Sequence, residues 1–106
     1  METKRYQSFA EFYPFYLSEH AKTGTRVLHF IGTTFFFAFL VAIALTGNLW
    51  YIPAAIITPY FMAWLGHFFI ERNKPATFQY PLWSLMGDFK LYFQILVGKE
   101  SLKGTA

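Results

Sequence analysis

Three histidines are the residues of this sequence whose type and spacing could support chemistry. His20, His29 and His67 are the only histidines among its 106 residues. Neutral imidazole binds Fe, Zn, Mn or Cu, and a set of three leaves coordination positions open for a substrate or oxygen. Titratable groups at membrane depth are costly, which marks them as functional candidates. The histidines therefore indicate a metal site, with structural histidines bonded to backbone carbonyls as the alternative.

Acidic side chains near the histidines could complete such a site. Glu71 follows His67 by four residues, which places both on one face of a helix. Glu71 is the candidate catalytic carboxylate, and an ion pair with Arg72 or Lys74 is the structural alternative. The chain has no cysteine, so thiolate metal sites and cysteine nucleophiles are excluded. It also lacks a Gly-rich phosphate loop and a Gly-x-Ser-x-Gly turn.

Two uncharged segments, each with one of the histidines, must position the site. The chain has nine Lys or Arg and six Asp or Glu, yet none of them lies in the 44 residues of 27–70. Segments 27–46 and 49–70 are long enough to cross a bilayer as helices of about 30 and 33 Å. The pair Gly47-Asn48 between them suits a left-handed cap and a tight reversal. The pattern predicts an antiparallel transmembrane hairpin.

The hairpin is expected to bring the histidines to one depth. His29 lies near the start of the first span and His67 near the end of the second. A fold-back returns both to the same membrane face, about 4 to 5 Å below each helix end. An amphipathic helix over residues 6–20, interrupted at Pro14, carries His20 on the face that docks inward. We expect the three imidazoles to meet in one shallow layer.

A third apolar helix is predicted over residues 82–97. Its length of about 24 Å is compatible with a short span, a re-entrant helix or an interfacial helix. Asp88 within this apolar segment requires a partner, such as Lys90, Arg72 or the metal site.

The predicted fold class is therefore all-α. The elements form a multi-pass helical membrane protein, a single membrane-embedded domain over residues 1–106 surrounded by lipids. Cations flank both ends of the hairpin while its turn is uncharged, which predicts a cytoplasmic N-terminus and a metal site on the cytoplasmic side. The cations are scattered and form no basic stripe for nucleic acid. One hairpin encloses little space, so a homo-oligomer is a further expectation.

Three motifs resemble those of a known family. They are FYLSEH at 15–20, TRVLHFIGT at 25–33 and GHFFIERNKPA at 66–76, followed by PLWSLMGDFK at 81–90. In this order and spacing, over nearly the whole chain, they resemble the iron-dependent 2-hydroxy fatty acid dioxygenase family. The resemblance implies a multi-pass membrane enzyme that uses Fe(II) and O₂ to shorten a 2-hydroxy fatty acid by one carbon, which is α-oxidation.

The resemblance also implies roles for individual residues. His20, His29 and His67 correspond to the motif histidines of the family and would be the iron ligands. The eukaryotic members have paired histidines at the first motif, where this chain has only His20. Glu71 or water is expected to fill that place.

The position of the substrate is expected to follow its own polarity. The tail would lie among the Phe-rich helices, with the carboxylate at the cytoplasmic face near Arg26, Arg72 or Lys74. Two other function classes stay open. A non-catalytic membrane scaffold or lipid-binding protein would have structural histidines and no stoichiometric metal. A small transporter would need polar groups through the full thickness of the membrane, and residues 35–45 offer none.

Overall fold

The computed structural model describes residues 6–104, and this part of the chain is helical with no strand. The all-α prediction is confirmed. Residues 1–5 and 105–106 of the predicted domain lie outside the described residues. The elements are α1 Phe9–Ser18, α2 Thr23–Thr46, α3 Tyr51–Leu65, the π-helical η1 Gly66–Glu71, the 3-10 helix η2 Ala76–Phe78 and α4 Pro81–Leu96.

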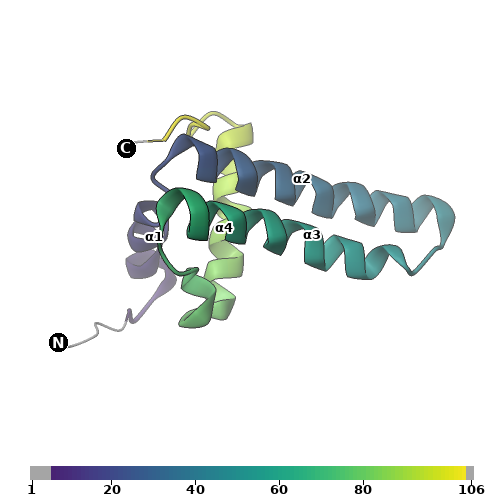
Figure 1. Cartoon of the computed structure of the whole chain (residues 1–106), viewed down its shortest axis with the longest axis horizontal. Coiled ribbons are helices and arrows are strands. Elements are labelled where there is room, and N and C mark those ends of the chain that lie inside the picture. The colour runs from purple at the N-terminus through teal and green to yellow at the C-terminus, as the bar shows by residue number, and fades with distance from the viewer. Residues whose placement is uncertain (1–5, 105–106) are drawn as a thin grey trace.

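The helices α2 and α3 form a long antiparallel hairpin, and α1 and α4 pack at its open end (Figure 1). The reversal occurs where the sequence predicts it. Gly47 is left-handed with a φ of 69°, and its N–H donates to the carbonyl of Ile43 at 2.8 Å. Glycine adopts this conformation without the steric cost of a Cβ. The predicted fold-back is thus present in the structure.

The start of α2 lies upstream of the predicted span because of a capping interaction. Lys22 is the N-cap residue, and its side chain makes no cap hydrogen bond. Instead, the backbone N–H of Lys22 donates to Oε2 of Glu71 at 2.7 Å. A carboxylate at a helix N-terminus is favourable both as an acceptor and for its charge. The end of the α3–η1 segment thereby holds the beginning of α2.

Small residues allow the two helices of the hairpin to approach closely. A Cβ on Gly32 would lie 3.0 Å from the Cα of Pro59, and a Cβ on Gly66 would lie 3.0 Å from Cγ2 of Thr25. Contacts this short leave no room for a larger side chain at either glycine. The close approach sets the distance between the histidine-bearing segments of α2 and η1.

The hairpin exposes most of its apolar surface. The segments Thr23–Thr46 and Tyr51–Glu71 have mean hydropathies of 2.2 and 1.3, with 17% of each measured window buried. A core helix of a soluble protein would be mostly buried. Both segments are long and apolar enough to cross a membrane. Large exposed apolar side chains along them include Val41, Leu45, Ile56, Ile57 and Phe61.

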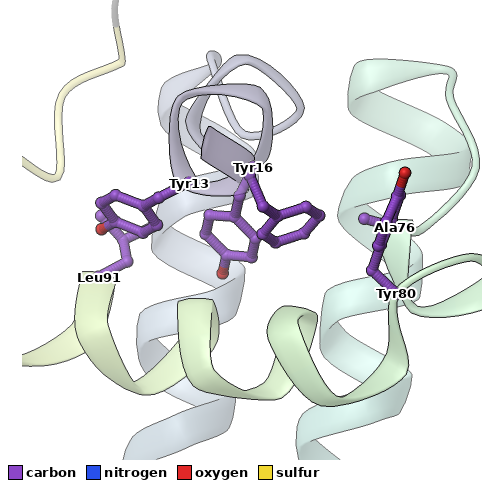
Figure 2. Close-up of a cluster of buried hydrophobic side chains, with 6 residues drawn as sticks. Tyr13, Tyr16, Ala76, Tyr80 and Leu91 are labelled. Carbon is purple, nitrogen blue, oxygen red and sulfur yellow. The ribbon is translucent and has the colours of Figure 1, made fainter. Parts of the chain in front are cut away.

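An aromatic core joins α1 to α4. Phe12 and Tyr16 of α1 are almost fully buried, as is Leu91 of α4. Figure 2 shows Tyr13 and Tyr16 directed toward α4, with Tyr80 near its start. Burying large aromatic side chains supplies most of the docking free energy of so short a helix.

The predicted interruption of the first helix at Pro14 is wrong. Helix α1 begins at Phe9 after Ser8, whose Oγ accepts from the N–H of Glu11 at 3.2 Å, and it continues through Pro14. Pro14 and Ala10 are both exposed, so the carbonyl that loses its partner can bind water. The aromatic contacts on the opposite face hold the helix together.

The third predicted helix is α4, shifted by one residue. It runs across the base of the hairpin rather than alongside it (Figure 1). Pro81 occupies its first turn, where the missing N–H has no helical partner to lose. This direction sets one face of α4 against the end of the hairpin that carries the histidines.

Candidate metal centre

The structure brings together three histidines from three elements. His20 follows α1, His29 lies in α2 and His67 lies in η1, and all three are buried. Their ring centroids are separated by 4.2, 4.6 and 5.2 Å. One ligand nitrogen from each lies within 4.8 Å of the others. Residues spread over 48 positions of the sequence therefore face a common point.

The three rings share one orientation, in which Nδ1 faces a carbonyl oxygen. The acceptors are the backbone carbonyl of Tyr16 for His20 at 2.7 Å, that of Thr25 for His29 at 3.1 Å, and Oδ1 of Asn73 for His67 at 2.8 Å. A carbonyl oxygen can only accept, so Nδ1 carries the proton in each ring. The lone pair of each neutral ring is consequently on Nε2. Metal-binding histidines commonly donate their other ring N–H in this way.

The contact between His20 and His29 supports a shared cation. Their Nε2 atoms are 2.9 Å apart, and with both Nδ1 atoms protonated neither ring has an N–H to donate across this gap. A metal with bonds of about 2.1 Å to two nitrogens at a right angle would hold them about 3 Å apart. The donor set therefore fits a transition metal ion of the kind that imidazole binds.

Asn73 fixes the orientation of His67. The π-helical turn η1 ends at Glu71, and its C-cap residue Arg72 is left-handed with a φ of 60°. The N–H of Asn73 then donates to the carbonyl of His67 at 2.9 Å, while its Oδ1 accepts from Nδ1 of the same residue. Its Nδ2 donates to the carbonyl of Glu19 at 3.3 Å. Asn73 thus connects the segments that carry His67 and His20.

Replacing Asn73 by alanine is expected to weaken metal affinity by about 10- to 100-fold, since such outer partners fix ring orientation. Titration of the metal-free protein with Fe(II) under oxygen-free conditions measures this. Asn48→Ala in the hairpin turn is the matched control and should keep the wild-type affinity. An Asn73→Ala variant that binds iron as tightly as this control would show that the amide does not orient the ring.

The other charged candidates lie around the cluster rather than in it. The carboxylate of Glu71 caps α2, as described above. Arg26 is buried, and it donates from Nε to the carbonyl of His20 at 2.8 Å and from Nη1 to the carbonyl of Ser101 at 2.8 Å and to Glu100 at 3.1 Å. Arg72 and Lys74 are exposed. Arg26 therefore ties the backbone of His20 to the C-terminal segment.

A cavity of about 340 Å³ opens beside the histidines. All three imidazoles line it, and none of the three candidate cations does. Its remaining wall is largely apolar and comes mainly from α2, α3 and α4, with Phe36, Ile56, Pro59, Leu85 and Phe89 among its residues. The space suits a molecule with an apolar chain and a polar end.

The sequence reasoning missed two residues of the site, Tyr16 of α1 and Ser84 of α4. Tyr16 stacks on His20 at 4.1 Å between ring centroids, and its hydroxyl donates to Oδ1 of Asp88 at 2.5 Å. The same oxygen lies 4.0 Å from Nε2 of His29. For Asp88 the sequence offered Lys90, Arg72 or the metal site as a partner, and the structure places it beside the metal site and adds Tyr16. Ser84, one turn before Asp88, gave no signal.

Burial dominates the electrostatics of these groups. It lowers the pKa of the His20 imidazole well below its ordinary value, and the neighbouring His29 and His67 act in the same direction. Burial also raises the pKa of Asp88 to about 7, against the opposing effect of the hydrogen bond from Tyr16. The low-dielectric surroundings thus favour the neutral form of the imidazole, which is the form that binds metals.

Comparison with protein families gives one match. The family model described as Mpo1-like, 2-hydroxy-palmitic acid dioxygenase Mpo1-like, matches residues 6–100. The matched region contains the three histidines and helices α1 to α4, in agreement with the motif resemblance. No match was found among curated proteins, and none among solved structures.

Proposed function

The chain belongs to the Mpo1-like family, and on this premise we propose that it is an Fe(II)-dependent dioxygenase that shortens a 2-hydroxy long-chain fatty acid by one carbon. The observation that carries the proposal is the buried group of three histidines at the wall of a largely apolar cavity, where one ligand nitrogen from each ring lies within 4.8 Å of the others. Histidines that only stabilise the fold would not need to bring their ligand nitrogens together. The family description supports the choice of reaction and substrate class.

His20, His29 and His67 would hold the iron in this proposal. Iron supplies the oxygen chemistry that amino-acid side chains lack. The chain itself positions the reactants and excludes water, since the histidines are buried and the cavity wall is largely apolar.

The overall reaction balances with one molecule of O₂. The bond between C1 and C2 of the 2-hydroxy acid breaks, C2 becomes the carboxyl carbon of the shortened acid, and C1 leaves as CO₂. One molecule of water forms, and the four electrons lost by C1 and C2 reduce O₂. No further reductant is needed.

The proposal places the site at the cytoplasmic surface of a membrane. Helix α2 and the α3–η1 segment would cross the bilayer, while α1 and α4 would lie at the interface. The exposed apolar surface of the hairpin and the direction of α4 across its base support this arrangement (Figure 1). An amphiphilic substrate could then reach the cavity from the lipid.

Iron-loaded protein is expected to convert 2-hydroxypalmitic acid to pentadecanoic acid. Protein purified in detergent without oxygen is loaded with Fe(II), given the substrate and then exposed to O₂, and the products are measured by mass spectrometry. Zinc-loaded protein is the control and should give no product because zinc has no redox chemistry. An iron-loaded sample that forms no shortened acid would contradict the proposal. Absence of any stoichiometric metal would favour a lipid-binding protein instead.

A further inference from the structure

The wall of the cavity formed by α4 carries two polar side chains that the proposed chemistry has not used. This inference rests on the proposed function and deepens it: we propose that Ser84 and Asp88 bind the 2-hydroxyl group of the substrate and thereby select hydroxylated over unsubstituted fatty acids. The two residues are one helical turn apart, so they share a face of α4, and both line the cavity.

Ser84 has an unused hydrogen-bonding group. Only 3% of the residue is exposed, and its Oγ has no hydrogen-bond partner within the described chain. Leaving a buried hydroxyl without a partner costs about 1 to 3 kcal/mol, and such groups are rare in folded proteins. The residue lines the cavity but its Oγ is closed to a water-sized molecule, so a bound molecule supplies the missing hydrogen bond once the Ser84 side chain rotates toward the cavity.

Asp88 supplies the complementary acceptor. Its Oδ1 accepts from Tyr16, and a carboxyl group retains further lone pairs for a ligand. A quarter of the side-chain surface is accessible, and the residue lines the cavity. A hydroxyl group fits this pair because it can donate to Asp88 and accept from Ser84 at the same time.

The location of the pair decides which part of the substrate it meets. Asp88 lies 4.0 Å from Nε2 of His29, so a group bound to it is adjacent to the proposed iron ligands. The substrate carboxylate is disfavoured at this place because a second acid already occupies it. The neutral hydroxyl on C2 is the remaining polar group of the substrate head. Ser84 and Asp88 line the cavity, whereas the cations that were expected near the carboxylate do not.

Binding measurements test the selection without turnover. Iron-loaded protein in detergent, kept free of oxygen, is titrated with 2-hydroxypalmitic, 3-hydroxypalmitic and palmitic acid. Wild type should bind the 2-hydroxy acid at least about tenfold more tightly than the other two, because a site built for a hydroxyl is left with unpaired groups by an analogue that lacks it. Equal affinity for the three acids would overturn the inference even without any variant.

The Ser84→Ala variant is expected to lose most of this preference while it binds palmitic acid as wild type does. Ser18→Ala, an exposed serine of α1, is the matched control and should retain the preference. A Ser84→Ala protein with the full preference would overturn the role of the hydroxyl. Preference for the 2-hydroxy acid in an inactive protein would contradict the proposed function alone, whereas turnover without preference would contradict this inference alone.

Discussion

Replacement of His29 by alanine is expected to remove stoichiometric iron binding and to lower turnover of the 2-hydroxy acid by more than about 100-fold. Loss of an outer partner already costs 10- to 100-fold in metal affinity, and His29 is an inner ligand in the proposed site. Its Nε2 also lies 2.9 Å from Nε2 of His20. Iron content after oxygen-free purification and conversion of 2-hydroxypalmitic acid are the two measurements.

The same loss is expected for His20→Ala and His67→Ala, because each ring supplies one of the converging nitrogens. Leu45→Ala is the control, since Leu45 lies near the far end of α2 and is largely exposed. Retention of iron and of turnover by all three histidine variants would show that the cluster is structural. If one variant retains iron and turnover, the histidine that it replaces is not an iron ligand.

Replacement of Gly87 by alanine is expected to destabilise the protein and to weaken iron binding, although it removes no ligand. A Cβ at this position would lie 2.8 to 3.0 Å from three atoms of the Tyr16 ring. Tyr16 is buried against α4 (Figure 2) and stacks on His20, so it cannot move without disturbing that ligand. Overpacking of this kind costs about 1 to 3 kcal/mol, which outweighs the gain of about 1 kcal/mol in helix propensity.

Gly24→Ala is the matched control for this prediction. It is also a helical glycine, but the three atoms nearest to its added Cβ all belong to the Ile70 side chain, with the terminal Cδ1 as the nearest at 2.8 Å. The side-chain end can rotate away, so this variant should be as stable as wild type or more stable. Thermal unfolding measures the stability of both variants, and Fe(II) titration measures their iron affinity. Equal stability and equal iron affinity would show that the contact between α4 and α1 tolerates the methyl group.

Much of the hairpin could be predicted because its determinants are local. Charge is absent from residues 27–70, the helical rise fixes the length, and Gly47 is suited to the left-handed conformation that it adopts. These features also predicted that His29 and His67 lie close together at one end of the hairpin. The continuity of α1 through Pro14 could not be predicted in the same way, because it depends on tertiary contacts. Packing of the aromatic face of α1 offsets the backbone hydrogen bond that proline cannot donate.

The roles of the charged residues depended on contacts that spacing does not reveal. Glu71 shares a helical face with His67, yet its carboxylate bonds to the backbone of Lys22. Arg26 likewise contacts partners that its position in the sequence did not reveal. Its guanidinium donates to the backbone of His20 and of the C-terminal segment, and the residue does not line the cavity. A long side chain can reach several partners, and only the tertiary packing selects among them.

The sequence by itself determined the all-α fold, the antiparallel reversal and the three histidines as the candidate ligands, because composition and helical periodicity act within single elements. Only the tertiary structure decided which face of α4 meets the hairpin, and with it the positions of Tyr16, Ser84 and Asp88 around the imidazoles. The rotation of one helix against another is set by side-chain packing between distant segments. No local pattern in the α4 sequence encodes that rotation.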